Sequence, residues 1–142
     1  MDVNEQDVRE RVQHYLTKHF RVGLERGGIL SIDLESTRGF VSVHARDDRV
    51  VVKVEAVVAF DVPDSQEMLT HVARASGEYL FGHLALHADD DKPGHNTVLF
   101  SHALLGNYLD EEELVNAVIA VVLTANEIDD DFVSRFGGGT FH

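Results

Sequence analysis

Residues 114–125, LVNAVIAVVLTA, carry no charge in a chain whose formal net charge is −13. A membrane-spanning helix needs about 20 consecutive apolar residues, and acidic clusters at 111–113 and 127–131 border this run closely. The run is therefore too short to cross a bilayer. Its apolar side chains repeat at helical spacing around most of the helix, which is typical of a helix that is buried on several sides.

The length and composition indicate one folded domain. The chain has 142 residues, of which 44% are hydrophobic and 26% are charged. Such a chain can form a single core, and we expect one domain over 1–142. The opening stretch, MDVNEQDVRE, is acidic and lacks the apolar centre of a secretory signal, so the expected location is the cytoplasm.

The charge and the absent residue types exclude several classes of function. Because 25 acidic residues face only 12 lysines and arginines, the field of the protein repels phosphate backbones and anionic lipids. We therefore expect neither nucleic acid nor a membrane as a partner. The chain contains no cysteine, which excludes disulfides, thiol catalysis and cysteine-ligated metal sites.

Apolar periodicity and helix-start signals predict the order α-β-β-β-α-β-β-α. The expected elements are a helix over 4–20, strands over 30–35, 39–46 and 49–61, a helix over 64–77, strands over 80–88 and 96–104, and a helix that starts at 111 and stops at Gly137. Antiparallel strands set apart from the helices predict an α+β domain with helices mainly on one face of the sheet.

Short polar signals mark the ends of these elements. Asn4, Asp64 and Asp110 each precede an apolar periodic stretch, and we expect each to cap its helix. The pair Asp47-Asp48 separates two β-branched runs, which predicts a tight hairpin turn. Residues 137–142 contain three consecutive glycines, and we expect a flexible tail there.

Alternation along the strands predicts two faces of different character. In the strand over 49–61 the core-facing residues are Val50, Val52, Val54, Ala56, Val58 and Phe60, and the opposite face carries Val51, Lys53, Glu55, Val57 and Ala59. In the later hairpin Leu84, Leu86, Val98, Phe100 and Leu104 face the helices, and Phe81, His83, Ala85, His87, Leu99 and Ser101 face away.

The outward face is neither fully polar nor fully apolar, as is typical of a surface that a partner chain contacts. We predict that its partner-binding residues are Val51, Val57, Phe81, His83, His87 and Leu99. The excess apolar surface of the last helix is a second possible contact. An ordinary solvated sheet face with scattered apolar residues is the alternative interpretation.

Several stretches resemble the bacterial YbjN family, which is similar in fold to the class I chaperones of type III secretion. They are FGHLAL at 81–86, HNTVLFSHALLG at 95–106, YLDEEELVNAVIAVVLTANEIDDDF at 108–132 and RFGGG at 135–139. The resemblance implies a small, usually dimeric, non-enzymatic domain that holds a peptide segment of a partner or regulates another protein. It implies no cofactor and transfers no catalytic motif.

Each candidate pattern of catalytic or metal-binding residues is better explained as part of the structure or the surface. Ser101 and His102 are neighbours on a predicted strand, so their side chains point to opposite faces and cannot form a triad. His83 and His87 share a face but are separated by about 13 Å along the strand, which is too far for one metal ion. The acidic triplets 89–91 and 129–131 are interpreted as solvated surface.

Three hypotheses about function therefore differ in class. The first is a peptide- or protein-binding chaperone-like or regulatory module, a homodimer, whose client is an unidentified protein or peptide. The second is a small-ligand-binding protein or enzyme with a pocket between sheet and helices, using His102 or Tyr108 beside acidic groups. The third is a purely structural dimerisation domain.

Overall fold

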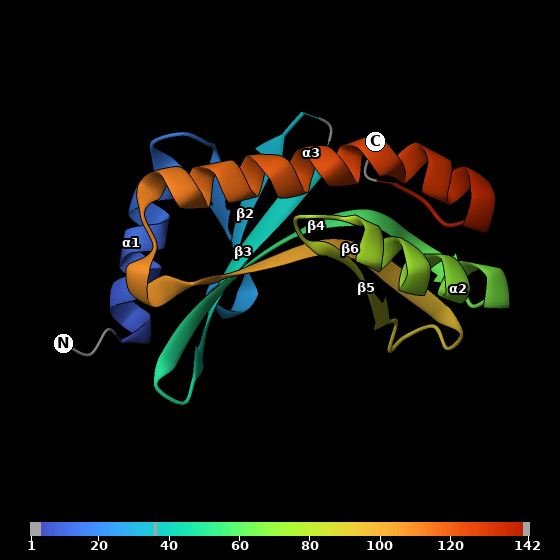
Figure 1. Cartoon of the computed structure of the whole chain (residues 1–142), viewed down its shortest axis with the longest axis horizontal. Helices are drawn as coiled ribbons and strands as arrows, with labels where there is room; N and C mark the ends of the chain where they lie inside the picture. Colours follow the sequence, from blue (N-terminus) through green and yellow to red (C-terminus); the bar gives the residue numbers. More distant parts are fainter. Residues whose placement is uncertain (1–3, 36, 141–142) are drawn as a thin grey trace.

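A computed structural model describes residues 4–35 and 37–140 of the chain (Figure 1). The helices and strands are α1 Glu5–Thr17, β1 Val22–Leu24, β2 Leu30–Leu34, β3 Thr37–Arg46, β4 Arg49–Pro63, α2 Gln66–Ala75, β5 His83–Ala88, β6 His95–Leu105 and α3 Glu111–Phe136. Short 3-10 turns at Arg26–Gly28, Ser76–Glu78 and Gly106–Tyr108 join some of them. The α+β class and the order of the predicted elements are confirmed, and β1 is an additional strand.

All six strands form one antiparallel sheet in the order β1-β2-β3-β4-β6-β5. Strands β3 and β4 join through the two-residue turn that the sequence predicts, because Arg46 pairs directly with Arg49. Asp47 adopts a positive φ of 55° in that turn, a conformation that Asp tolerates better than most residues. The longest strand, β4, lies in the middle of the sheet between β3 and β6.

Side-chain caps start each of the three helices. Asn4 and Asp110 cap α1 and α3 as predicted, each accepting a hydrogen bond from the amide three residues further on, at 2.8 and 2.7 Å. The predicted cap of α2 is wrong by one residue, because Ser65 caps the helix: its Oγ accepts a hydrogen bond from the Met68 amide at 3.1 Å. Asp64 instead accepts a hydrogen bond from the Asn96 side chain at 2.6 Å, which ties the start of α2 to β6.

The helices cover one face of the sheet. Helix α3 runs across the sheet along the length of the molecule, with α1 near one end and α2 near the other (Figure 1). The buried residues of all three helices join one core with the helix-facing side of β4: Val8, Val12, Leu16, Met68, Val72, Leu114, Val118, Val121 and Ala125 with Val50, Val52, Val54, Ala56 and Val58. The predicted separation of a covered face from an uncovered one is therefore confirmed.

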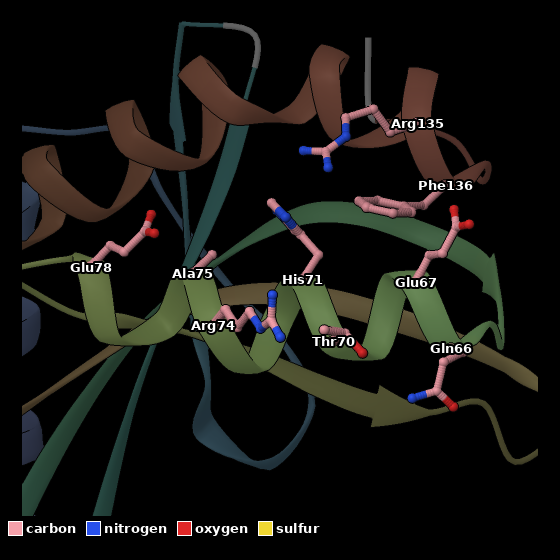
Figure 2. A pocket seen from close by; sticks show the side chains of 9 residues that line it. All are labelled: Gln66, Glu67, Thr70, His71, Arg74, Ala75, Glu78, Arg135 and Phe136. Atoms are coloured by element: carbon pink, nitrogen blue, oxygen red, sulfur yellow. The ribbon is translucent and has the colours of Figure 1, made fainter.

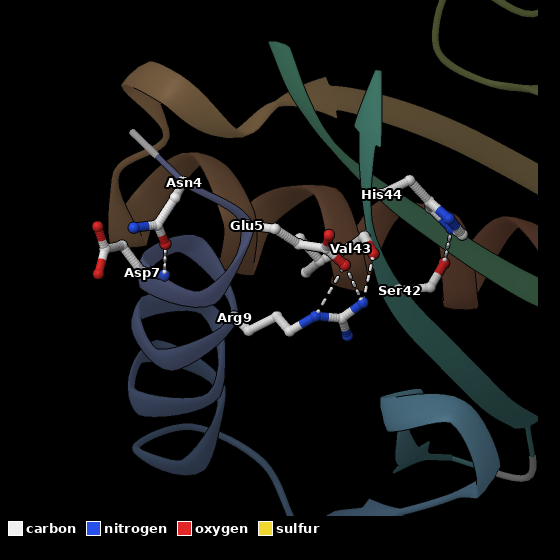
Figure 3. Close-up of polar contacts among 7 residues, drawn as sticks. All are labelled: Asn4, Glu5, Asp7, Arg9, Ser42, Val43 and His44. Atoms are coloured by element: carbon white, nitrogen blue, oxygen red, sulfur yellow. Dashed lines mark hydrogen bonds and ion pairs between the residues drawn. The ribbon is translucent and has the colours of Figure 1, made fainter. Parts of the chain in front are cut away.

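Polar contacts fix the helices over β3. The guanidinium of Arg9 on α1 pairs with Glu5 and donates to the carbonyl of Val43 at 2.8 Å (Figure 3). The hydroxyl of Thr37 and the side-chain oxygen of Asn126 on α3 lie 2.8 Å apart. These contacts hold both helices against the same strand.

The register of β4 changes after Val57. Shifts relative to β6 occur between Val57 and Ala59 and again between Ala59 and Val62. A bulge of this kind places an extra residue in one strand and reverses the alternation beyond it. The prediction that Ala59 faces away from the helices and Phe60 faces the core is therefore wrong, because Ala59 is fully buried opposite Val98 and Phe60 is 40% exposed.

The C-terminal segment returns to β4. Gly137 ends α3 with a φ of 89°, and Gly139 then exchanges two backbone hydrogen bonds with Phe60, each 2.9 Å long. Part of the stretch predicted as a flexible tail is thus attached to the sheet beside the bulge. Residues 141 and 142 of that predicted tail lie outside the described residues.

Candidate functional site

The face of the sheet away from the helices, here called the open face, is built from the outward residues of β3, β4, β6 and β5. Directly paired residues of antiparallel strands project to the same side, so the register defines rows of side chains that cross the strands. Four rows follow one another along β4: His44–Val51–Leu105, Ser42–Lys53–Ala103, Phe40–Glu55–Ser101–His83, and Val57–Leu99–Ala85.

The first and last of these rows are mainly apolar. Val51 and Val57 are half-buried, and Leu105 is 51% exposed at the end of β6. Leu99 is only 8% exposed, and its row neighbours are Val57 on β4 and Ala85 on β5. The open face therefore carries apolar side chains in the rows of Val51 and of Val57, on either side of the polar rows between them.

The row between Phe40 and His83 is polar at its centre. Glu55 Oε2 and Ser101 Oγ are buried and have no hydrogen-bond partner among the described residues. Lys53 Nζ lies 3.7 Å from Glu55 Oε2, which is an ion-pair distance but longer than a hydrogen bond. In a catalytic triad the histidine lies between the serine and the acid. In this row Ser101 lies between Glu55 and His83, so the row does not have the arrangement of a catalytic triad.

The structure places five of the six predicted contact residues on the open face. Val51, Val57, His83, His87 and Leu99 all belong to outward positions of the register. These residues do not form one compact cluster, since His87 pairs with Thr97, beyond the row of Val57. That they bind a partner stays a prediction.

The prediction that Phe81 faces outward with them is wrong. Strand β5 starts only at His83, and Gly82 has a φ of 76° that breaks the alternation. The Phe81 ring stacks on His102, with ring centroids 3.8 Å apart. His102 pairs with the fully buried Val54, so Phe81 lies on the helix-covered side and packs against the core.

The second hypothesis placed a pocket between sheet and helices with His102 or Tyr108 in it. Burial, together with the nearby His83, lowers the pKa of His102 below its ordinary value of 6.5. Tyr108 is 87% exposed in the turn before α3. Neither residue lines the cavities described below.

A cavity of about 710 Å³ lies between α2 and the end of α3 (Figure 2). Its lining mixes acidic, basic and aromatic side chains, including Glu67, His71, Arg74, Arg135 and Phe136. His71 lies against Phe136 with ring centroids 5.1 Å apart, and its burial, followed by the charge of Arg135, lowers its pKa. Opposite charges are balanced here, which gives the cleft no clear preference for a charged ligand.

Two kinds of feature are absent from the described residues. No group of three or more histidine, aspartate or glutamate side chains there is arranged to hold a metal ion. In the same part of the chain, none of the helices is both long enough and apolar enough to span a membrane.

Comparison with known proteins identifies the family. The profile of TY-Chap1, described as the type III secretion system (YopN, CesT) and YbjN peptide-binding chaperone 1, matches residues 6–142. The chain belongs to this family. No curated protein sequence matches it.

Two solved structures are similar to this chain in fold. YbjN from E. coli is similar with a TM-score of 0.64 and 10% sequence identity, covering 89% of this chain and 93% of YbjN. A chain of the ExsC–ExsE complex is similar with a TM-score of 0.54 and 17% identity, covering 92% of this chain and 96% of that one. The YbjN and secretion-chaperone resemblance predicted from the sequence is thereby confirmed.

Sequence reasoning missed the contribution of β3 to the open face. Phe40, Ser42 and His44 alternate with the buried Val41 and Val43 in GFVSVHAR, so the signal was present. Counting outward from the predicted two-residue turn would have paired His44 with Val51. The length of the turn, and not the composition of the strand, would therefore have predicted which residues of β3 and β4 share a row.

Proposed function

We propose that this TY-Chap1 domain is a non-enzymatic chaperone-like module that binds an extended peptide segment of another protein on its open face. The observation that carries the proposal is the location of apolar side chains on a sheet face that none of the described helices covers. Val51 and Leu105 form one row, and Val57 and Leu99 another. The description of the family as peptide-binding chaperones supports the same ligand class.

The electrostatic field favours some peptides over others. With a formal net charge of −13, the domain attracts basic segments and repels strongly acidic ones at low ionic strength. The client is an unidentified protein, and the proposal concerns the chemistry of its bound segment: extended, rich in apolar side chains and not polyanionic.

A random peptide display library, selected against the purified domain, tests this proposal. A selected peptide is synthesised with a fluorescent label, and its affinity is measured by fluorescence anisotropy for the wild type and for two variants. Val51→Asp places a charge in the apolar contact of the open face and should weaken binding by about tenfold or more. Leu123→Asp changes an exposed residue of α3 in the same way and should leave the affinity unchanged.

Two outcomes would contradict the proposal. The library could yield no binder, or Leu123→Asp could weaken the complex while Val51→Asp does not. The second result would assign binding to the apolar surface of the last helix. Leu123 is 42% exposed and Val51 is half-buried, so circular dichroism should show that both variants remain folded.

We further propose that the module acts in the cytoplasm as a homodimer. Leu69 on α2 is 44% exposed and Leu80 in the following loop is fully exposed, and a second copy of the chain would cover such apolar groups. Light scattering on the purified protein should give the mass of two chains, and Leu80→Ser should shift it toward one. A monomer at micromolar concentration contradicts the dimer, and cell fractionation tests the location.

A further inference from the structure

The open face contains one small pocket with a basic lining. This basic pocket, about 230 Å³, is formed by His44 and Arg46 of β3, Val51 and Lys53 of β4, and Ala103 of β6. One water molecule occupies roughly 30 Å³ in the liquid, so the pocket has room for a group of several heavy atoms. It lies between the row of Val51 and the row of Lys53.

Basic side chains gather at this end of the face although the chain as a whole is acidic. Arg46 pairs directly with Arg49, so two like charges lie opposite each other, an arrangement that destabilises a sheet unless a counter-ion is close. Arg49 has a highly exposed contact with Asp48 at 4.0 Å. Arg46 has no ion pair among the described residues, and Lys53 reaches its single carboxylate, Glu55, only at 3.7 Å.

The donors around the pocket therefore have unused hydrogen-bonding capacity. A guanidinium presents a planar fork that matches a carboxylate in two parallel hydrogen bonds, and an ammonium group adds up to three further donors. His44 Nε2 lies 2.8 Å from Ser42 Oγ (Figure 3), which fixes the imidazole at the rim. A single carboxylate would accept hydrogen bonds from both cations and reduce the repulsion between the two arginines.

From this arrangement we infer that the basic pocket binds one carboxylate of the bound peptide, next to an apolar residue that contacts Val51 and Leu105. The inference rests on the proposed peptide-binding function of the open face and adds the specificity of one position. A polyanion does not fit, because the surrounding net charge of −13 repels it. The carboxylate can come from an Asp or Glu side chain or from the C-terminus of the client, and the experiment separates these sources.

The random peptide library provides the first readout. Selected sequences should share an Asp or Glu next to an apolar residue, or a free C-terminus at a constant distance from one. A selected peptide is then synthesised in its carboxylate form and with that one carboxylate replaced by an amide, either Glu→Gln or a C-terminal amide. The wild-type domain should bind the amide form about tenfold more weakly, since a charge-assisted hydrogen bond is lost.

Variants of the pocket complete the test. In the double variant Arg46→Gln, Lys53→Gln the carboxylate and amide forms should bind with equal affinity. Arg74→Gln is the control, because it removes one positive charge from an exposed position on α2 at the helix-covered side and should preserve the difference. Thermal unfolding checks that the variants remain folded.

Each result assigns or removes the carboxylate site. Equal affinities of the two peptide forms for the wild type, or a preference that survives in the double variant, would overturn the inference while peptide binding itself stands. Loss of the preference in Arg74→Gln alone would place the carboxylate in the cleft between α2 and α3. A library without any binder would overturn the proposed function together with the inference.

Discussion

Gly39 allows α3 to approach β3 more closely than any larger residue would. A Cβ atom at this position would lie 2.7 Å from Val122 Cγ2, whereas carbon atoms in contact prefer about 3.5–4.0 Å. Val122 is fully buried and has one strongly favoured rotamer in a helix, so its methyl group cannot turn away. We therefore expect Gly39→Ala to force α3 away from the sheet.

The magnitude combines two opposing effects. Overpacking a buried site costs about 1–3 kcal/mol. Replacing glycine by alanine also restricts the unfolded chain, which stabilises the fold by about 0.4–1 kcal/mol. The backbone of Gly39 is not in the left-handed region, so no conformational strain adds to the cost. The net expectation is a loss of about 1–2 kcal/mol in the free energy of unfolding, measured by urea denaturation with circular dichroism.

A control and a rescue make the reasoning refutable. Gly77→Ala meets no atom within 4 Å and has no positive φ, so it should be neutral or stabilise by up to about 1 kcal/mol. Val122→Ala alone should cost about 2 kcal/mol through lost methyl groups and the cavity left behind. If the clash with Val122 is the cause, the double variant should be at least about 1 kcal/mol more stable than additivity predicts. Strict additivity would refute the argument.

Single contacts elsewhere in the fold give three further expectations. Asp110→Ala should lower the free energy of unfolding by about 1 kcal/mol, whereas Asp110→Asn should keep most of the stability of the wild type. Equal losses for the two variants in denaturant unfolding would contradict a stabilising cap at Asp110. Gly138→Ala should speed hydrogen exchange at the Phe60 amide, because Gly138 has a φ of 90° and its Cβ would lie 2.5 Å from the Phe60 carbonyl oxygen; unchanged exchange would disprove this. His102 should titrate below pH 6.5 by NMR. The stability that neutral His102 contributes is therefore present above about pH 6.5 and is lost as the pH falls through the pKa of the folded state. Phe81→Ala should raise the pKa of His102, and an unchanged titration would exclude burial by the stacked ring as the cause of the shift.

Features that depend on neighbouring residues in the chain could be predicted from the sequence. The caps Asn4 and Asp110 and the Asp47-Asp48 turn each follow from a few adjacent residues, and the structure confirms all three. Alternation also separates the two faces of β4 correctly up to Val57. Local chemistry thus gives most of the elements and their inward sides, although it placed the cap of α2 at Asp64 instead of Ser65.

Features that depend on pairing with a distant strand were not accessible in the same way. The bulges after Val57 arise from the register with β6, and nothing in the run AVVAF marks the position at which the alternation reverses. Phe81 was assigned by extending the period of β5 backward through Gly82, whose positive φ ends the strand. Strand β1 was missed because Val22–Leu24 is too short to show a period.

The same distinction applies to the open face. Five predicted contact residues lie there, because parity along a strand determines which side a residue faces. The basic pocket could not be predicted from any one strand, since it combines side chains of β3, β4 and β6. Only the register brings Arg46, Lys53 and Ala103 together, and register is a property of paired strands.

The rows of the open face also set the length of peptide that it can bind. Val51 and Val57 are six residues apart on β4 with no register shift between them, so about 20 Å separates them along the strand. An extended peptide that runs along the strands needs about six residues to span that distance. A peptide that crosses β3, β4, β6 and β5 would instead span three strand spacings, about 14 Å, or about four residues. Truncation of a selected peptide should therefore show a sharp loss of affinity below about six residues if it lies along β4. Full affinity in a peptide of about four residues would show that the chain lies across the strands.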